Sequence, residues 1–266
     1  MRRSPAMTVM IRAAEKAGRA VIRDFGEVEQ LQASQRGPKD FVAKAEAKSD
    51  EVIREMLQQA RPRFGLMQAT TGEVTGEDTS HRFIVAPING RANFMHGLPS
   101  FAVSIALEES REVIAGVIYN PITDEMFWGE RNGGSYVHDR RLRVSKRNSL
   151  SDCLLAGGGP APASDESAAP PSGDWLGITG RIAGSGAGIR MQGAAALNMA
   201  HVAAGRLDGY IASGPHGWDV AAGVIIVREA GGQVTDFSGG PRWLDKREIV
   251  AGPPDLHRQL TKLATG

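Results

Sequence analysis

The sequence is poor in cysteine and has no long apolar run. Cys153 is the single cysteine among 266 residues, which excludes an internal disulfide and favours a reducing compartment. No segment approaches the roughly 20 apolar residues of a membrane span, and the basic residues at positions 1–5 are not followed by the apolar stretch of a signal peptide. We therefore expect a cytoplasmic protein with no membrane contact.

An excess of charge of one sign is also missing. Thirty-one Lys and Arg stand against thirty Asp and Glu, giving a net charge of +1, so bulk charge predicts no nucleic-acid partner. A local basic cluster at residues 140–147 has no interleaved aromatic residues, and a solvated hairpin is favoured over a nucleic-acid site. The six histidines show no metal-ligand spacing. His96 and His216 are the candidates for a place at a pocket, with ordinary loop histidines as the favoured interpretation.

What is present is enough apolar sequence for a large core, 41% of the residues. Residues 1–150 read as an α+β half: helices at about 4–25 and 45–60, a loop at 33–39, then strands that form a largely antiparallel sheet. Residues 151–266 alternate helices and strands, as in α/β proteins. A Gly/Ala/Pro/Ser-rich stretch at 156–173 is expected to be the seam between the halves of one compact unit.

The centre of the first half is a strand predicted at residues 82–86, which ends at Pro87 and the turn Asn89-Gly90. Residues 86–94 read Ala-Pro-Ile-Asn-Gly-Arg-Ala-Asn-Phe, and residues 218–223 read Trp-Asp-Val-Ala-Ala-Gly. Together these segments resemble the two signatures of the inositol monophosphatase family, Asp-Pro-(Ile/Leu)-Asp-Gly-Thr-x-Asn-Phe and Trp-Asp-x-Ala-Ala-Gly. The resemblance implies a layered αβαβα sandwich and a homodimer.

The resemblance also implies a Mg²⁺ site built from four carboxylates. The matching positions in this chain are Ala69, Ala86, Asn89 and Asp219, of which Asp219 alone is acidic. Glu73 would replace the missing ligand at Ala69 only if the register slipped by about four residues. Since Mg²⁺ prefers several hard oxygen ligands, this set predicts weak retention of metal.

Further positions near the family's site also differ. Residues 40–46 resemble the family's Asp-(Leu/Phe)-Val-Thr-x-x-Asp, with Ala43 for the Thr and Glu46 for the second Asp. Glu46 is expected either to reach a cation or to be a solvated residue in the first turn of a helix. Arg91 stands where the family has a water-positioning Thr, and Ala212 where many relatives have a sugar-binding Glu.

Two interpretations follow, and we favour the first from sequence. It is a catalytically inactive or strongly impaired member of the family that binds a protein partner or a small anion such as phosphate and needs no cofactor. The anion would lie against Gly90, Arg91 and Ala92, with Ala212 and His216 as further lining, and Asp219 would serve as a helix cap. A salt bridge or a solvent-facing side chain is an equally favoured interpretation of Arg91. The alternative is a Mg²⁺-dependent phosphomonoesterase, acting on inositol phosphate or a related sugar or nucleotide phosphate, that relies on Asp219, Glu46 and Glu73.

Overall fold

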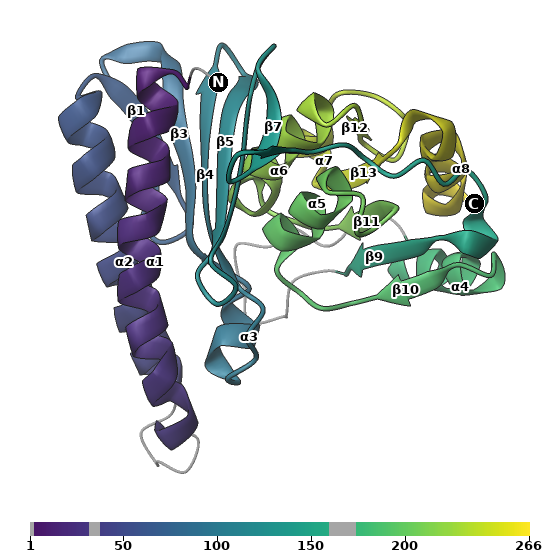
Figure 1. The fold of residues 1–266 in the computed structure, drawn as a ribbon, viewed down its shortest axis with the longest axis horizontal. Helices are drawn as coiled ribbons and strands as arrows, with labels where there is room; N and C mark the ends of the chain where they lie inside the picture. The colour runs from purple at the N-terminus through teal and green to yellow at the C-terminus, as the bar shows by residue number, and fades with distance from the viewer. Residues whose placement is uncertain (1–2, 32–37, 160–173) are drawn as a thin grey trace.

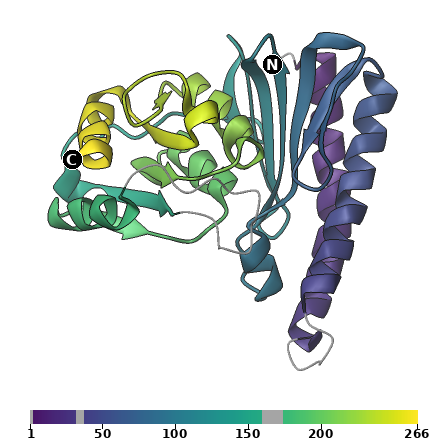
Figure 2. The same ribbon diagram turned by 180° about the vertical axis from the view of Figure 1, so that it is seen from behind.

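The computed structural model describes residues 3–31, 38–159 and 174–266, and these form five layers. Helices α1 (Pro5–Leu31) and α2 (Pro38–Ala60) cover one face of the first sheet (Figures 1 and 2). Helices α5 (Ala195–Ala203) and α6 (Gly217–Glu229) lie between the two sheets, and α4 (Trp175–Gly184) and α8 (Pro254–Thr265) pack on the outer side of the second sheet. The expected αβαβα sandwich is therefore confirmed.

The first sheet has eight strands in the order β2-β1-β3-β4-β5-β6-β7-β8. Only the pair of β1 and β3 is parallel, so the predicted antiparallel character is confirmed. Its strands are β1 (Phe64–Gln68), β2 (Gly72–Val74), β3 (Asp78–Asn89), β4 (Ala102–Glu109), β5 (Glu112–Asn120), β6 (Glu125–Glu130), β7 (Gly134–Val137) and β8 (Arg140–Arg141).

The second sheet has five strands in the order β10-β9-β11-β13-β12. Strand β9 pairs in parallel with both neighbours, whereas β13 pairs antiparallel with both of its own. Its strands are β9 (Leu154–Gly158), β10 (Gly188–Arg190), β11 (Gly209–Ser213), β12 (Gln233–Thr235) and β13 (Glu248–Gly252). Short helical segments are α3 (Arg91–Met95), α7 (Trp243–Lys246) and the 3₁₀ turn Leu150–Asp152.

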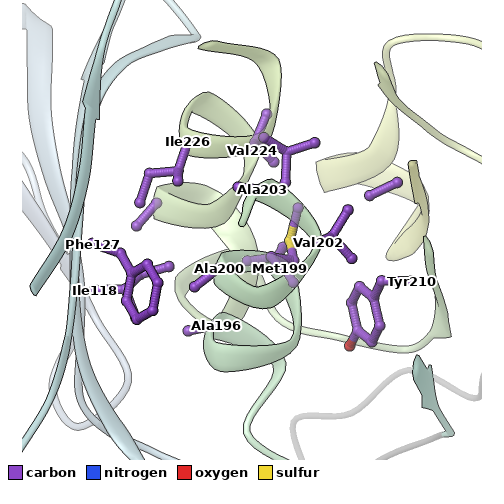
Figure 3. Close-up of a cluster of buried hydrophobic side chains, with 14 of the residues drawn as sticks. Ile118, Phe127, Ala196, Met199, Ala200, Val202, Ala203, Tyr210, Val224 and Ile226 are labelled. Carbon is purple, nitrogen blue, oxygen red and sulfur yellow. The ribbon is translucent and has the colours of Figure 1, made fainter. Parts of the chain in front are cut away.

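The main core lies around α5 and α6, between the two sheets. Figure 3 shows Phe127 of the first sheet, Met199 of α5, Ile226 of α6 and Tyr210 of the second sheet in this cluster. Both helices read as almost entirely apolar because each is buried on all sides. The proposed halves 1–150 and 151–266 thus share one core, while their division remains a prediction.

Several predicted boundaries were wrong. Helix α2 begins at Pro38, because proline suits the first helical turn and Asp40 interacts well with the helix dipole there. Strand β3 runs past Pro87 to Asn89, since a register shift between Ala86 and Asn89 frees the proline from the ladder.

Some predictions fall wholly or partly outside the described residues. Positions 33–37 of the predicted loop and positions 160–173 of the predicted seam are in this category. Residues 38–39 belong to α2 and residues 156–158 to β9, so the loop and the seam were placed too widely. Within the described part of the chain, no helix has the length and apolar character to cross a membrane.

Candidate functional site

A pocket of about 270 Å³ opens where strand ends of both sheets meet two helix starts. The carboxyl ends of β3, β9 and β11 converge there with the N-termini of α5 and α6. Strand ends and helix starts present free backbone groups together, which makes such places common ligand sites. Its polar lining comes from Asn89, Asn198, Tyr210, His216 and Asp219, and its small residues include Gly90, Gly158, Ala194 and Ala212.

Asp219 is the third residue of α6, and both oxygens of its carboxylate accept hydrogen bonds. Oδ2 accepts from the backbone N–H of His216 at 3.0 Å, and Oδ1 accepts from Nδ2 of Asn89 at 2.9 Å. Burial raises the pKa of Asp219, and the His216 N–H, the His216 ring, Asn89 and Arg247 oppose that rise. Asp219 therefore caps α6 and forms one wall of the pocket.

Asn89 connects three elements at the base of the pocket. Its Nδ2 donates to Asp219 on α6, and its Oδ1 accepts from the backbone N–H of Ala196 in the first turn of α5 at 2.9 Å. The side chain is buried, with 2% of its surface exposed. A buried amide with both ends satisfied fixes the relative position of its partners, so Asn89 ties β3 to both central helices.

Gly90 follows Asn89 and has a left-handed backbone with φ of 94°. A Cβ atom at this position would lie 2.9 Å from the backbone oxygen of Ser100 and 3.0 Å from Cβ of Ala194. Both the backbone angle and the space favour glycine. This turn directs the chain away from β3 and leaves the pocket open beside it.

We expect Gly90→Ala to destabilise the protein by about 1–3 kcal/mol, because the added methyl group meets backbone on one side in a strained conformation. Urea unfolding followed by circular dichroism measures the change. Gly26→Ala is the matched control, since nothing lies within 4 Å of a Cβ at that helical position. An unchanged unfolding midpoint for Gly90→Ala would contradict the packing described for this turn.

Arg91 and Glu46 form an ion pair beside the pocket. Nη1 of Arg91 lies 3.4 Å from Oε2 of Glu46, and the side chains are 56% and 9% exposed. Neither Arg91 nor Ala92 is among the residues that line the pocket, and both are exposed. Arg91 thus contacts an acid rather than an open anion site, and Glu46 contacts a cation supplied by the chain itself.

Glu46 and Asp50 are neighbouring buried acids, one turn apart on α2. Desolvation raises the pKa of Glu46; Arg91 lowers it and Asp50 raises it further. Desolvation also raises the pKa of Asp50, against hydrogen bonds from Thr70 and Gln68. The folded state therefore favours the protonated forms of both carboxyl groups more than the unfolded chain does.

Because the pKa of Glu46 is raised on folding, its contribution to stability is present at low pH and is lost as pH rises above the ordinary value of about 4.5 through the folded pKa. We expect Glu46→Gln to reduce this loss. The free energy of unfolding, measured by urea titration across this pH range, should fall less with pH in the variant than in the parent. Parallel pH profiles would show that Glu46 does not titrate differently in the folded state.

The other expected positions are spread around the pocket. Ala43 is exposed on α2, and Ala69 lies at the end of β1, where its N–H donates to Val85 of β3 at 3.2 Å. Ala86, 1% exposed, follows Val85. Glu73 receives a hydrogen bond from Arg82 at 2.6 Å and lies outside the pocket, whereas Ala212 and His216 line it. His96 is exposed and does not line it.

The residues present do not fit a site for the two or three Mg²⁺ ions implied by the family signatures. Among the described residues, no three Asp, Glu, His or Cys side chains gather in a way that could hold a metal ion. Asp219 is the acidic residue that lines the pocket, and both its oxygens already accept hydrogen bonds. Neutral Asn89 and the alanines at 69 and 86 add no negative charge.

Sequence reasoning missed most of the other lining residues, and three of them show why. Tyr210, Asn198 and Gly158 come from β11, α5 and β9, and their patterns are those of ordinary buried elements. Burial, and then Asp219, raise the pKa of Tyr210, so its hydroxyl stays protonated. The nearest available signal was Gly157-Gly158-Gly159 at the start of the Gly/Ala/Pro/Ser-rich stretch, since consecutive glycines allow close backbone approach.

The comparisons with known proteins cover nearly the whole chain. The model of the inositol monophosphatase family matches residues 3–265. A protein of Mesorhizobium japonicum named inositol-1-monophosphatase is 45% identical over 98% of this chain and 97% of its own. Escherichia coli Nus factor SuhB is 35% identical over 96% and 94%. A crystal structure of extragenic suppressor protein suhB from Bartonella henselae has a TM-score of 0.88 and 45% identity, covering 98% and 99%.

These findings correct two expectations. The interpretation as a catalytically inactive or strongly impaired homologue that acts by binding is contradicted, because relatives that are 43–45% identical along nearly their full length are named inositol-1-monophosphatase. The expectation of no cofactor is contradicted as well, since members of the family depend on Mg²⁺. The missing side-chain ligands remain a difference from the family pattern, within a chain that belongs to the inositol monophosphatase family.

Proposed function

We propose that this chain is a phosphoric monoester hydrolase, acting on inositol phosphate or a related sugar or nucleotide phosphate, with Mg²⁺ as the cofactor of its family. The observation that carries the proposal is the 45% identity over 98% of the chain to a protein named inositol-1-monophosphatase. The corresponding site is the pocket between β3, α5 and α6.

The charges at the pocket support binding of a phosphate monoester. The N-termini of α5 and α6 both reach it, and a helix N-terminus attracts anions through its free N–H groups and its dipole. His216 also lines the pocket, where its ring stacks on that of Trp218 and contributes a ring nitrogen. The protonated Tyr210 hydroxyl offers a donor to a sugar hydroxyl.

Because few carboxylates are available as ligands, we expect turnover to require a high concentration of free Mg²⁺. One carboxylate that is already hydrogen bonded competes poorly with water for a cation that sheds its hydration shell reluctantly. We therefore expect turnover to keep rising with Mg²⁺ into the millimolar range. Asn89 and Asp219 would hold the pocket in shape, because their hydrogen bonds join β3 to both helices.

Phosphate release from inositol 1-phosphate, followed from micromolar to tens of millimolar Mg²⁺, tests the proposal. We expect release that depends on Mg²⁺, is abolished by a chelator and is lost in Asp219→Ala. Glucose 1-phosphate and a nucleoside monophosphate, assayed in parallel, identify the preferred ester. Release no faster than in Asp219→Ala at every Mg²⁺ concentration would overturn the proposed activity.

We also propose that the chain forms a homodimer, as the family resemblance implies. Light scattering coupled to size-exclusion chromatography measures the mass in solution directly. A mass near twice the 28.3 kDa of the chain is the expected result. A monomeric mass at all concentrations would contradict this.

A further inference from the structure

A second and larger hollow, of about 760 Å³, lies between α8 and β12. We call it the α8 groove and define it by Arg228, Thr235, His257, Arg258, Thr261 and Lys262. It shares no lining residue with the pocket at Asp219. The α8 groove therefore belongs to a separate surface, on the outer side of the second sheet.

The sequence of α8 divides the helix into two faces. Leu256, Leu260 and Ala264 are buried against the second sheet, at spacings of four residues. His257, Arg258, Thr261 and Lys262 recur at spacings of three and four on an adjoining face, and all of them line the groove. The same helix thus anchors itself by its apolar face and presents a polar, basic face to the hollow.

Three cations line the α8 groove and no acidic side chain does. Arg228 comes from the last turn of α6, while Arg258 and Lys262 are one turn apart on α8. None of the three is in an ion pair with any residue that the structure describes. Like charges gathered without counter-charges create a positive potential that attracts anions.

Three nearby acids are already engaged, and a fourth, Asp255, lies in the first turn of α8, outside the residues that line the groove. Asp236 accepts from the backbone N–H groups of Ser238 and Gly240 and lies 3.1 Å from Nζ of Lys246. Glu248 accepts from the N–H of Phe237 at 3.2 Å. Glu112, whose charge acts on Arg228, lies 3.5 Å from Arg131. Asp236 and Glu112 each have a cation of their own, and no acid lines the groove, so the lining itself carries a net positive charge.

Hydrogen bonds fix the side chains at the base of the α8 groove. Nε2 of buried His257 lies 3.1 Å from Oγ1 of Thr235, and the Thr235 hydroxyl donates to the backbone oxygen of Asp236 at 2.8 Å. On the opposite side, Arg228 donates to the backbone oxygen of Val234 at 3.4 Å. The edge strand β12 and α8 are thus kept at a set spacing before any ligand arrives.

We propose that the α8 groove binds a small multivalent phosphate anion, of the di- or triphosphate class. Arginine forms paired hydrogen bonds with phosphate oxygens and lysine acts as a compact point charge, so Arg258 and Lys262 suit adjacent phosphate groups. Side chains four residues apart on a helix are about 5–6 Å apart at Cβ, a separation that neighbouring phosphates can span. Arg228 completes the charge from the other wall. Inorganic pyrophosphate and a nucleoside triphosphate share this chemistry.

Isothermal titration calorimetry with inorganic pyrophosphate, in Mg²⁺-free buffer at physiological salt, tests the site. We expect binding that weakens at least about tenfold in the double variant Arg258→Gln with Lys262→Gln, because two charge-assisted contacts are removed. Arg140→Gln is the matched control, an exposed arginine on β8 that lies outside the groove. ATP and adenosine, titrated separately, distinguish a nucleotide site from a bare polyphosphate site.

The double variant should keep the parental hydrolysis of inositol 1-phosphate when no pyrophosphate is present, since the groove and the pocket share no residue. If the double variant fails to fold, Arg228→Gln, which removes the cation on α6, is expected to weaken pyrophosphate binding as well. Equal pyrophosphate binding by parent and variants, or no binding at physiological salt, would overturn the proposal. Tighter binding of single-stranded RNA than of either phosphate ligand, through the same three residues, would overturn it as well.

Discussion

Restoring the family's residues at four positions, as Ala69→Glu, Ala86→Asp, Asn89→Asp and Arg91→Thr together, is expected to lower the Mg²⁺ concentration for half-maximal turnover by about tenfold or more. Ala69 and Ala86 lie at the end of β1 and on β3, next to each other across the parallel pair. Asn89 is already 2.9 Å from Asp219. The carboxylate added at position 89 would lie beside Asp219, and those added at positions 69 and 86 would lie beside each other.

The same variant should depend on Mg²⁺ for stability. Several carboxylates in a buried pocket repel one another, so unfolding without metal should occur at a lower temperature than in the parent, and added Mg²⁺ should reverse the loss. Differential scanning calorimetry with and without Mg²⁺ measures this, independently of turnover.

The matched control for this experiment is Ala69→Gln with Ala86→Asn and Arg91→Thr, which adds similar side chains without negative charge. Its Mg²⁺ requirement should stay at the parental value. If the charged and neutral variants need the same Mg²⁺, the missing carboxylates do not limit metal binding in this chain, and the account of the thin ligand set is wrong.

Gly223→Ala should destabilise the protein by about 1–3 kcal/mol and reduce turnover, because it overpacks the crossing of α5 and α6. A Cβ at position 223 would lie 2.5 Å from Cβ of Met199 on α5. Neither atom can rotate away, so one helix must shift. Both helices carry their N-termini to the pocket, and a shift there would move Ala196 and Asp219 relative to Asn89.

Chemical denaturation and the inositol 1-phosphate assay together test this prediction. Gly180→Ala in α4 is the control, since nothing lies within 4 Å of a Cβ there and alanine favours a helix. We expect the control to keep parental activity with equal or slightly higher stability. A fully stable and active Gly223→Ala variant would show that the two helices tolerate a wider separation than their packing indicates.

Gly223 shows how a motif can be recognised before its physical role is understood. The segment Trp-Asp-Val-Ala-Ala-Gly identified the family from sequence, yet it gave no reason for its final glycine. The reason is the contact with Met199, a residue 24 positions earlier in the chain (223 − 199). Asn89 is similar: the sequence showed a missing carboxylate, and the fold shows an amide that joins β3 to α5 and α6.

For Arg91 the sequence left two interpretations open, an anion site on one side and a salt bridge or solvent-facing side chain on the other. A new guanidinium beside a turn suggested an anion site, because sequence places it next to free N–H groups. Its partner, Glu46, lies 45 residues earlier (91 − 46), and their 3.4 Å ion pair depends on how α2 packs beside β3. The expectation of an inactive protein came from counting ligand positions one by one. That count takes no account of the pocket that the helix N-termini and strand ends build together.

The sequence by itself determined the family, the layered architecture and the order of most helices and strands, because hydrophobic periodicity and two local motifs are properties of neighbouring residues. Tertiary structure alone decided which side chains meet: Asn89 with Asp219, Arg91 with Glu46, and the basic face of α8 with β12. Each of these contacts joins residues from different elements. Their chemistry is set by distances and burial that exist only after the layers have packed.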